Sequence, residues 1–455
     1  MKNVRSFVVI GAMIFGAAVS AQAWAAGPRL EVTPNHLSFG QVVAGTVSAP
    51  QIVTISNSGG AAMSIGLDTS GLFLVSAGDC GAMLNAGASC QASITFHAPA
   101  GRRKETVGKL LIGGESGTKR VRRTVPLRGA SFTAVTTGIF VTLLQQPGPQ
   151  IAAFPLTANG NVHPAATIEF PSKPGTPTVN PYGIAVAPNG TIYAATCVGF
   201  GSDSSLLYFP AGSRGEPKPA GVINLESEVI CPGSVALDSS GNIYYILQGG
   251  IPGIVLVYGS GATGNATPIS LISGDNTGLT WPADVAVDSA RKIYVSNFQG
   301  GQAGFGSITI FAAGSNGNVA PAATITGPDT GLGYPVGVAV DSAGDIYVVN
   351  SQGTQTFGSS SVTVYSPGSN GDAAPISTIV GPDTNLYFSG GVALDSSGNI
   401  YVTNSASSDS QNGSITVYSP GSNGDVAPIR TIAGNKTGLD TEPNAIVIGP
   451  LAPRR

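Results

Sequence analysis

Side chains that could carry enzyme chemistry are scarce in this sequence of 455 residues. Three histidines are present, His36, His97 and His163, and no serine or cysteine is placed with them in a way that indicates a nucleophilic triad. The sequence also lacks a Gly-rich phosphate loop, a Cys-x-x-Cys pair and the spacing of zinc ligands. These patterns argue against nucleophilic, phosphate-transfer and zinc chemistry.

A set of aspartates recurs at one position of a repeated motif, Asp-Ser-x-x-x-Ile-Tyr. Its members are Asp238, Asp288, Asp341 and Asp395. A ring of carboxylates could bind a cation, but an aspartate that opens a tight turn commonly accepts hydrogen bonds from the backbone of that turn. We therefore favour a turn-capping role over a functional ring.

The first 26 residues have the features of a secretory signal peptide. Lys2 and Arg5 give a positive start, Phe7 to Val19 is apolar but short for a bilayer span, and small residues follow. We predict cleavage near Ala23 to Ala26 and a protein that is secreted or periplasmic. The first cysteine, Cys80, is not near enough to be a lipoprotein cysteine, and no later stretch predicts a transmembrane segment.

Four cysteines in an exported chain indicate two disulfides, for which the sequence alone permits three pairings. Local context favours Cys80 with Cys90, which closes a short loop, and Cys197 with Cys231, which closes a longer one. The chain-entropy relation predicts that the first disulfide stabilises the folded state by about 3 kcal/mol and the second by about 4 kcal/mol. The alternative is that the cysteines are buried free thiols.

The composition indicates an all-β protein. Gly (64) and Pro (32) are abundant, hydrophobic residues make up 42% of the chain, and charged residues make up only 10%. Short Val, Ile and Tyr runs lie between turn residues, as in strands of all-β proteins. The formal net charge of −3 predicts no strong attraction to polyanions, and so no nucleic-acid partner.

Residues 28–131 predict a β-sandwich of about seven short strands. Segments such as QIVTISNSG and CQASITFHA alternate apolar and polar residues, and turn residues separate them at intervals of about ten. The order PNHLSFGQVVAGTVSAPQIVTISNSGGAAMSI, Phe73, Cys80, Cys90, ASITFHAPAG and VPLRG resembles abnormal-spindle/hydin-type immunoglobulin-like (Ig-like) domains. Similar modules occur in bacterial choice-of-anchor proteins. The resemblance implies an accessory or adhesion module and not a catalyst.

The end of this segment is basic. Nine of the 21 Lys and Arg residues of the chain lie between Arg102 and Arg128. Period-two alternation places Val125 and Leu127 on one face of the last strand, and Arg120 and Arg122 on the other. The basic strand, Arg120 to Arg128, either contacts an anionic surface such as lipopolysaccharide or a polysaccharide, or is a solvated strand face.

Repeats organise residues 138–450. A hairpin motif, consisting of an aromatic residue, GSNG or a relative, a proline and an apolar strand, occurs six times at spacings of 49 to 55 residues. The copies begin at Phe154, Phe209, Tyr258, Phe311, Tyr365 and Tyr418. A second motif, such as PVGVAVD at Pro335, also occurs six times. Units of four short strands in about 50 residues are typical of propeller blades.

A count of the strands predicts a six-bladed β-propeller closed by strands from both ends of the chain. Five complete units follow Pro181, and three strands before them combine with the final NAIVIG strand as the sixth blade. The motif P-x-G-[IV]-A-[VL]-D-x-x-G-x-I-Y-V is similar to NHL repeats. This resemblance implies a fold but no single function, because propellers host binding, lyase, lactonase and scaffold roles alike.

The resemblance to propeller enzymes implies where an axial metal site would lie. Propeller lactonases hold a divalent cation with carboxylate and Asn side chains at the starts of their inner strands. The matching positions here are Gly183, Ser234, Asp284, Gly337, Gly391 and Ala445. Only Asp284 is a carboxylate, and Asn444 lies one position earlier in its own strand. Calcium takes about six to eight oxygen ligands, so we expect no cofactor, or at most a weak calcium site near Asp284.

The family geometry also implies one face of the propeller that carries loops of variable length. Variable loops on a rigid scaffold are the usual place for binding residues, and aromatic residues gather in them. The candidate ligand-binding residues are Trp281, Phe298, Phe305, Tyr334, Phe357 and Tyr387, with Asp284 and Asn444 at the axis. The alternative is that the aromatic side chains wedge between blades.

We therefore expect an exported, non-catalytic binding or scaffold protein whose partner is a protein or glycan of the cell envelope. A first alternative is a metal-dependent propeller enzyme, similar to a lactonase or lyase, centred on Asp284 and Asn444. A second alternative is a purely structural surface protein.

Overall fold

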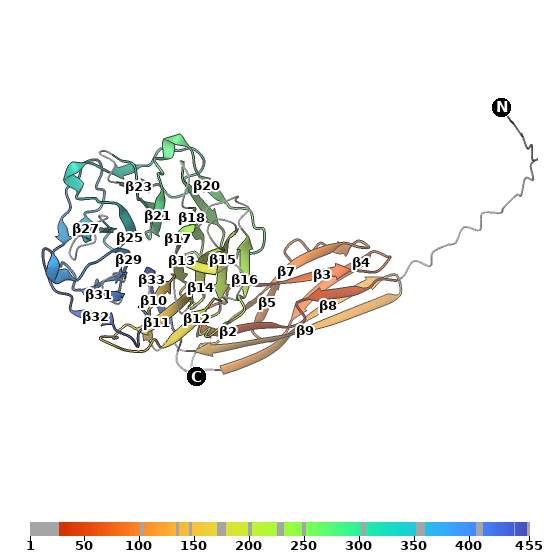
Figure 1. Ribbon diagram of the computed structural model, residues 1–455. Helices are drawn as coiled ribbons and strands as arrows, with labels where there is room; N and C mark the ends of the chain where they lie inside the picture. Colours follow the sequence, from red (N-terminus) through yellow and green to blue (C-terminus); the bar gives the residue numbers. More distant parts are fainter. Residues whose placement is uncertain are drawn as a thin grey trace, which may run out of the picture.

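The protein is all-β in its computed structural model, and the described residues form eight β-sheets (Figure 1). The structure describes residues 27–100, 104–132, 136–144, 148–170, 179–198, 203–224, 232–247, 252–301, 306–351, 360–405, 413–440 and 442–452. The predicted signal peptide, residues 1–26, lies outside this set. No helix in the described part of the chain is long and apolar enough to cross a membrane.

Two sheets pack face to face as a β-sandwich in the N-terminal part of the chain. Their strand orders are β1-β3-β7-β5 and β2-β9-β8-β4-β6. The strands are β1 (Leu30–Thr33), β2 (Leu37–Val43), β3 (Gln51–Asn57), β4 (Met63–Thr69), β5 (Phe73–Ser76), β6 (Met83–Leu84), β7 (Ser89–Phe96), β8 (Lys104–Ser116) and β9 (Lys119–Phe132). Inward-facing residues of both sheets form one buried core, in which the rings of Phe73 and Phe96 lie 5.1 Å apart.

The sandwich has more strands than the alternation of its sequence predicts. The additional strands β5 and β6 are only four and two residues long, which is too short to show a period of two. In contrast, β8 and β9 are 13 and 14 residues long and pair along their whole length, from Lys104 opposite Ser131 to Ser116 opposite Lys119.

Six four-stranded antiparallel sheets form the rest of the protein, and we call them blades 1 to 6. Within a blade the strands are named a to d from the axis outward. In this order blade 1 has β13 (Val179–Val186), β14 (Ile192–Val198), β15 (Asp203–Phe209) and β16 (Gly221–Asn224); blade 2 has β17 (Pro232–Leu237), β18 (Ile243–Leu247), β19 (Ile254–Tyr258) and β20 (Ser270–Ile272); blade 3 has β21 (Pro282–Val287), β22 (Ile293–Asn297), β23 (Ser307–Phe311) and β24 (Ala323–Ile325).

Blade 4 has β25 (Pro335–Val340), β26 (Ile346–Asn350), β27 (Ser361–Tyr365) and β28 (Ser377–Ile379); blade 5 has β29 (Ser389–Leu394), β30 (Ile400–Asn404), β31 (Ser414–Tyr418) and β32 (Arg430–Ala433). Blade 6 combines the C-terminal β33 (Pro443–Leu451), as strand a, with β10 (Thr136–Leu143), β11 (Gln150–Pro155) and β12 (Ala166–Glu169). Short 3₁₀ turns follow strand d in blades 2 to 4, namely η1 (Asp275–Thr277), η3 (Pro328–Thr330) and η4 (Pro382–Thr384).

The blades surround a common axis, as in a β-propeller (Figure 1). The inner strands β13, β17, β21, β25, β29 and β33 are neighbours in this order, and β33 is also a neighbour of β13. A parallel bridge joins each strand d to the following blade, for example Ile325 to Gly371, and Ile168 of blade 6 to Gly215 of blade 1. These bridges cover strand edges that would otherwise be open to pairing with other chains.

A glycine after strand d permits a hydrogen bond between blades 3 and 4. The φ angle of Gly327 is 141°, and an added Cβ would lie 2.3 Å from the carboxylate carbon of Asp372. Asp372 accepts a hydrogen bond from the backbone N–H of Asp329 at 2.7 Å. The junction between blades 5 and 6 is built in the same way, since Asn161 accepts the N–H of Lys436 at 2.8 Å.

The sandwich docks on the hairpin face of the propeller, which we define as the face with the a–b turns and c–d hairpins. In blade 1, the backbone carbonyl of Asn189 accepts the N–H of Val43 at 3.3 Å. The side-chain Nδ2 of Asn189 donates to the Val47 carbonyl at 2.7 Å. The hydroxyl of Tyr208 donates to the Pro50 carbonyl at 3.1 Å. These contacts leave the sandwich on the side opposite to the loop face, which carries the b–c and d–a loops.

Candidate functional site

The recurring aspartates cap their own turns, and this confirms the sequence prediction. Asp395 accepts the N–H groups of Ser397 at 2.9 Å and Asn399 at 3.0 Å, and it also accepts the Tyr401 hydroxyl at 2.9 Å. Burial raises the pKa of Asp395, but the hydrogen bonds outweigh this effect and hold the pKa below its usual value. Backbone N–H groups of the turn also donate to Asp238, Asp288 and Asp341.

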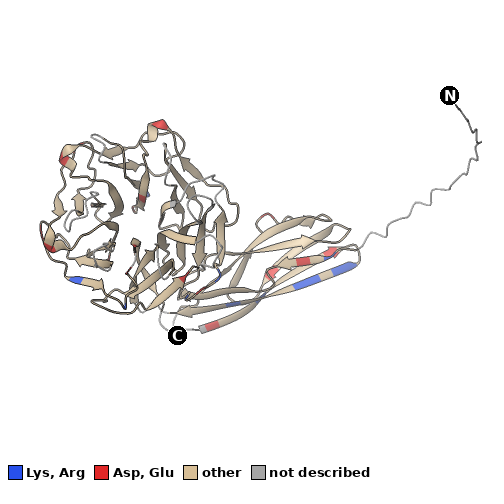
Figure 2. Cartoon of the chain, in the orientation of Figure 1, with Lys and Arg blue, Asp and Glu red and all other residues tan. Residues whose placement is uncertain are grey.

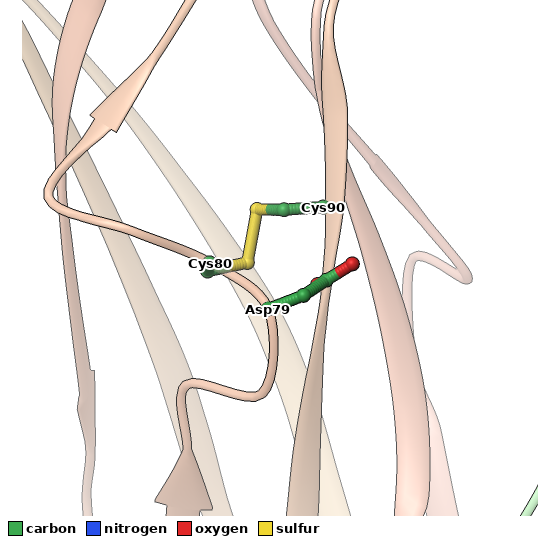
Figure 3. A group of neighbouring side chains, drawn as sticks. All are labelled: Asp79, Cys80 and Cys90. Carbon is green, nitrogen blue, oxygen red and sulfur yellow. A yellow bond between two sulfur atoms is a disulfide. The ribbon is translucent and has the colours of Figure 1, made fainter.

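The predicted disulfide between Cys80 and Cys90 is present in the sandwich (Figure 3). With Asp79 these residues form the only group of metal-ligand type among the described His, Cys, Asp and Glu residues. Their sulfur atoms are bonded to each other and are not thiolate ligands, and the Asp79 carboxylate accepts a backbone N–H. Cys197 is also disulfide-bonded, and its predicted partner, Cys231, lies outside the described residues.

A channel of about 490 Å³ lies among the six inner strands. Among the residues that line it, one position toward each end of every inner strand is half-exposed. Near the loop face the channel-lining residues differ between blades: Tyr182, Gly233, Ala283, Val336, Gly390 and Asn444. Near the hairpin face they form a ring of branched aliphatic side chains: Val186, Leu237, Val287, Val340, Leu394 and Ile448. That ring offers no acid, base or metal ligand.

Asp284 lies one position beyond the first of these rings, where the inner strands approach each other closely. At Gly337, the equivalent of Asp284 in blade 4, an added Cβ would lie 2.8 Å from a carbonyl oxygen of blade 5. The Asp284 carboxylate accepts the N–H of Val338 in blade 4 and of Val285, both at 2.8 Å, and it is hydrogen-bonded to Ser234 of blade 2. Burial raises the pKa of Asp284 from 3.8 to about 6, although these hydrogen bonds oppose the rise.

Asn444 lies on the other side of the channel. Its strand β33 is three places away from the β21 strand of Asp284 in the ring of inner strands. The side-chain Nδ2 of Asn444 donates to the Tyr182 carbonyl of blade 1 at 3.0 Å, and the backbone carbonyl of Asn444 accepts the Thr403 hydroxyl of blade 5 at 2.6 Å. Asp284 and Asn444 therefore each connect neighbouring blades, and the fold does not place them side by side.

Three aromatic residues occupy one equivalent position in successive blades. Trp281, Tyr334 and Phe388, which we call the aromatic trio, directly precede the inner strands of blades 3, 4 and 5. Their φ angles are 53°, 53° and 40°, in a left-handed region that costs a bulky residue about 1–2 kcal/mol. Trp281 is 40% exposed, and the other two are half-buried. Because they directly precede strand a, all three lie on the loop face of the propeller.

A hydrogen-bond network holds each member of the trio in this conformation. In blade 4 the Tyr334 carbonyl accepts the N–H of Ser351 at 3.2 Å, and Oδ1 of the buried Asn350 accepts the N–H of Gly333 at 3.1 Å. The Nδ2 of Asn350 donates to the Thr363 hydroxyl at 3.1 Å. Equivalent networks in blades 3 and 5 are built on Asn297 and Asn404. A strained conformation persists only where its surroundings determine it in this way.

The other predicted aromatic residues support the trio or lie elsewhere. The Phe298 ring packs on Tyr334 with centroids 5.1 Å apart, and the buried Tyr387 packs edge-on against Phe388 at 4.8 Å. Phe305 and Phe357 lie outside the described residues. Phe388 was not among the predicted binding residues, although its place in the repeat, directly before strand a, matches that of Trp281 and Tyr334.

The basic strand of the sandwich is partly neutralised. Figure 2 shows Lys and Arg along β9 and acidic residues on the strands beside it. Val125 and Leu127 are buried while Arg120 and Arg122 are exposed, as the alternation predicts. The Nε of Arg120 lies 2.9 Å from Oε1 of Glu115 on β8. This face is therefore a mixture of charges and not a uniform cationic surface.

No protein-family model and no curated protein matches the chain. Among solved structures, a protein of unknown function from Bacteroides caccae is 13% identical over 69% of this chain and 98% of its own, with a TM-score of 0.48. A DUF4784 family protein from the same species is 13% identical over 92% of this chain and 98% of its own, with a TM-score of 0.42. A virginiamycin B lyase from Staphylococcus aureus is 10% identical over 70% of this chain and 89% of its own, with a TM-score of 0.37. The propeller fold rests on the strand pairing described above and not on these low similarities.

Proposed function

We propose that this chain is an exported, non-catalytic binding or scaffold protein that uses the loop face of its propeller to bind a partner protein or a polymer of the cell envelope. The observation that carries the proposal is the aromatic trio, which lies on the loop face while the sandwich docks on the hairpin face. Backbone strain at bulky residues is typical of positions where the conformation serves a contact.

The proposal includes a finer description of the fold and of the cellular location. The propeller, residues 138–450, is a six-bladed ring of the NHL-repeat type, closed by strands from both ends of the chain. The pairing of β33 with β10 and the contact of β33 with β13 support this closure. Residues 28–131 are an Ig-like domain of the choice-of-anchor type, and residues 1–26 are a signal peptide that directs the chain to the periplasm or beyond.

The arrangement of the axial residues favours binding over catalysis. A metal-dependent enzyme centred on Asp284 and Asn444 would need free ligand atoms of both side chains near one ion. The carboxylate of Asp284 already accepts backbone hydrogen bonds from two blades, and Asn444 lies on the opposite side of the channel, three inner strands away. In this proposal the protein works without a cofactor.

Capture of envelope components on the immobilised mature protein tests the proposal. Trp281→Asn combined with Tyr334→Asn removes two aromatic rings but keeps a residue that tolerates left-handed backbone. The matched control is Ile269→Ala with Ile376→Ala, which removes exposed apolar groups from the residues directly before the outer strands of blades 2 and 4. We expect the first pair to lose capture and the second pair to keep it.

Two other results would overturn the proposal. Equal capture by both variants would show that the loop face is not the binding surface, and no capture by the native protein would favour the purely structural alternative. Metal analysis of the purified protein provides the separate test of catalysis. A stoichiometric divalent ion, with a melting temperature that falls in chelator, would favour the lactonase-like or lyase-like alternative.

A further inference from the structure

One pair of neighbouring strands in the propeller is not joined by a loop of its own blade. In blades 1 to 5 the four strands follow one another along the chain, whereas blade 6 combines β33 from the end of the propeller with β10 from its beginning. These two strands pair from Thr136 opposite Leu451 to Leu143 opposite Pro443. Loss of this pairing would therefore open the ring and expose two strand edges.

The sandwich packs at one end of this pairing. Strand β9 ends at Phe132 and residues 133–135 connect it to β10, while Ala452 directly follows β33. The buried side chains of Phe132 and Ala452 form a small apolar cluster with Ala211 of blade 1, and Val43 of the sandwich packs against it. This cluster, which we call the closure cluster, joins the sandwich, blade 1 and the end of β33.

A glycine of blade 1 allows these three parts to approach closely. The φ angle of Gly212 is 76°, and an added Cβ would lie 3.2 Å from the Cβ of Ala452 and 3.3 Å from Nε2 of Gln41 in the sandwich. Gln41 is buried and forms an antiparallel bridge with Ala211. In such close packing, each part loses contacts when one of the others moves away.

Arginine side chains hold blade 6 at both of its junctions. From blade 1, Arg214 donates Nη1 to the Ala165 carbonyl of blade 6. From blade 5, Arg430 donates Nη1 to the Leu156 carbonyl and also to the Ala158 carbonyl at 3.2 Å. Charge-assisted hydrogen bonds of this kind are stronger than those between neutral groups. The blade that closes the ring is therefore fastened to both of its neighbours, and the closure cluster adds the sandwich to this arrangement.

We propose that the sandwich locks the ring closed. Docking of the sandwich and pairing of β33 with β10 are coupled, because both place side chains in the closure cluster. Coupling of this kind is reciprocal, so a change that detaches the sandwich loosens β33, and a change that loosens β33 weakens docking. A partner that competes for the docking surface of the sandwich would then open the ring at blade 6. This inference does not depend on what the loop face binds.

Hydrogen exchange of the mature full-length protein measures both sides of this coupling. Val43→Asp leaves every propeller residue unchanged, and the cost of burying an unpaired charge should detach the sandwich. The matched control, Leu111→Asp, adds the same charge at an exposed side chain of the sandwich. Peptides of β33 should exchange at least about tenfold faster in Val43→Asp than in the native protein. Peptides of β25 and β26 in blade 4, and all propeller peptides of the control, should exchange as in the native protein.

Leu451→Ala tests the same coupling from the closing strand. Leu451 is buried at the end of β33, so its truncation should loosen this end of the strand. The control, Val348→Ala, truncates a buried side chain of blade 4. The N–H of Val43, which is bonded to the Asn189 carbonyl of blade 1, reports docking. We expect Leu451→Ala, and not Val348→Ala, to speed exchange of the peptide that contains Val43 by about tenfold or more.

Three results would overturn the inference. In Val43→Asp, a detached sandwich with unchanged exchange of β33 would show that closure is independent of docking. In Leu451→Ala, faster exchange of β33 with unchanged exchange at Val43 would show the same from the other side. Equally fast exchange in blades 3 and 4 would show a loss of overall stability in place of a local coupling. If Val43→Asp leaves the sandwich docked, the Leu451→Ala comparison decides alone.

Discussion

Asp284→Asn should remove a pH-dependent component of stability. Burial raises the pKa of Asp284 from 3.8 to about 6, and this difference corresponds to about 3 kcal/mol between the two protonation states. Because the pKa in the folded protein is the higher one, the folded state binds the proton more tightly. The stabilising contribution is therefore fully present below about pH 4 and is lost as the pH rises through about 6. Asn resembles the neutral acid in shape and does not titrate.

Urea unfolding of both proteins at several pH values measures this component. The free energy of unfolding of the native protein, minus that of Asp284→Asn, should fall by about 3 kcal/mol between about pH 3.5 and pH 7.5. Taking the difference cancels every other group that titrates equally in both proteins. A difference that is constant with pH would refute the reasoning, because Asp284 would then have similar pKa values in the folded and unfolded chains. A difference that rises with pH would show that the hydrogen bonds from Val338 and Val285 outweigh burial.

Three further predictions concern the junctions between blades and the closure of the ring. Gly327→Ala should lower the free energy of unfolding by about 2 to 3 kcal/mol, because the φ of 141° and the nearby Asp372 both exclude a Cβ. Gly314 has open space around it, so Gly314→Ala should lower that free energy by only about 1 kcal/mol, and urea unfolding compares the two variants. Asn350→Ala should lower the free energy of unfolding by about 2 to 4 kcal/mol, since it leaves the Gly333 N–H and the Thr363 hydroxyl without their buried partner. An unchanged melting temperature would contradict this. Removal of residues 443–455 deletes the inner strand of blade 6 and should abolish cooperative melting, which calorimetry would show; a single sharp transition in the shortened chain would mean that β33 is dispensable.

The aromatic trio shows which features of the loop face can be predicted from the repeat pattern alone. Trp281 and Tyr334 are recognisable from the sequence because each precedes the proline that opens an inner strand, and the loop face collects such residues. Their left-handed φ angles are not recognisable, because a bulky residue gives no local sign that it will adopt a conformation typical of glycine. The angle depends on the buried Asn350 and its equivalents, which reach the loop from the end of strand b.

The features that could be predicted from the sequence are local in origin. Period-two alternation, turn residues and the 50-residue repeat depend on residues that are neighbours along the chain, and they indicated the strands, the Asp395 type of turn and the Cys80–Cys90 disulfide. The strand count also predicted that the last strand of the chain joins the three strands that precede Pro181, and β33 does pair with β10 in blade 6.

The contacts between groups of different blades could not be predicted from the sequence. Asp284 is engaged by Val338, 54 residues away, and Asn444 by Tyr182, 262 residues away, so their roles in joining blades depend on the ring that brings these strands together. The docking of the sandwich on the hairpin face could not be predicted either. Tyr208 and Pro50 are 158 residues apart, and no sequence pattern links the two positions. Local periodicity specifies each strand, whereas the packing of separate blades specifies which side chains meet, and the candidate site is made by that packing.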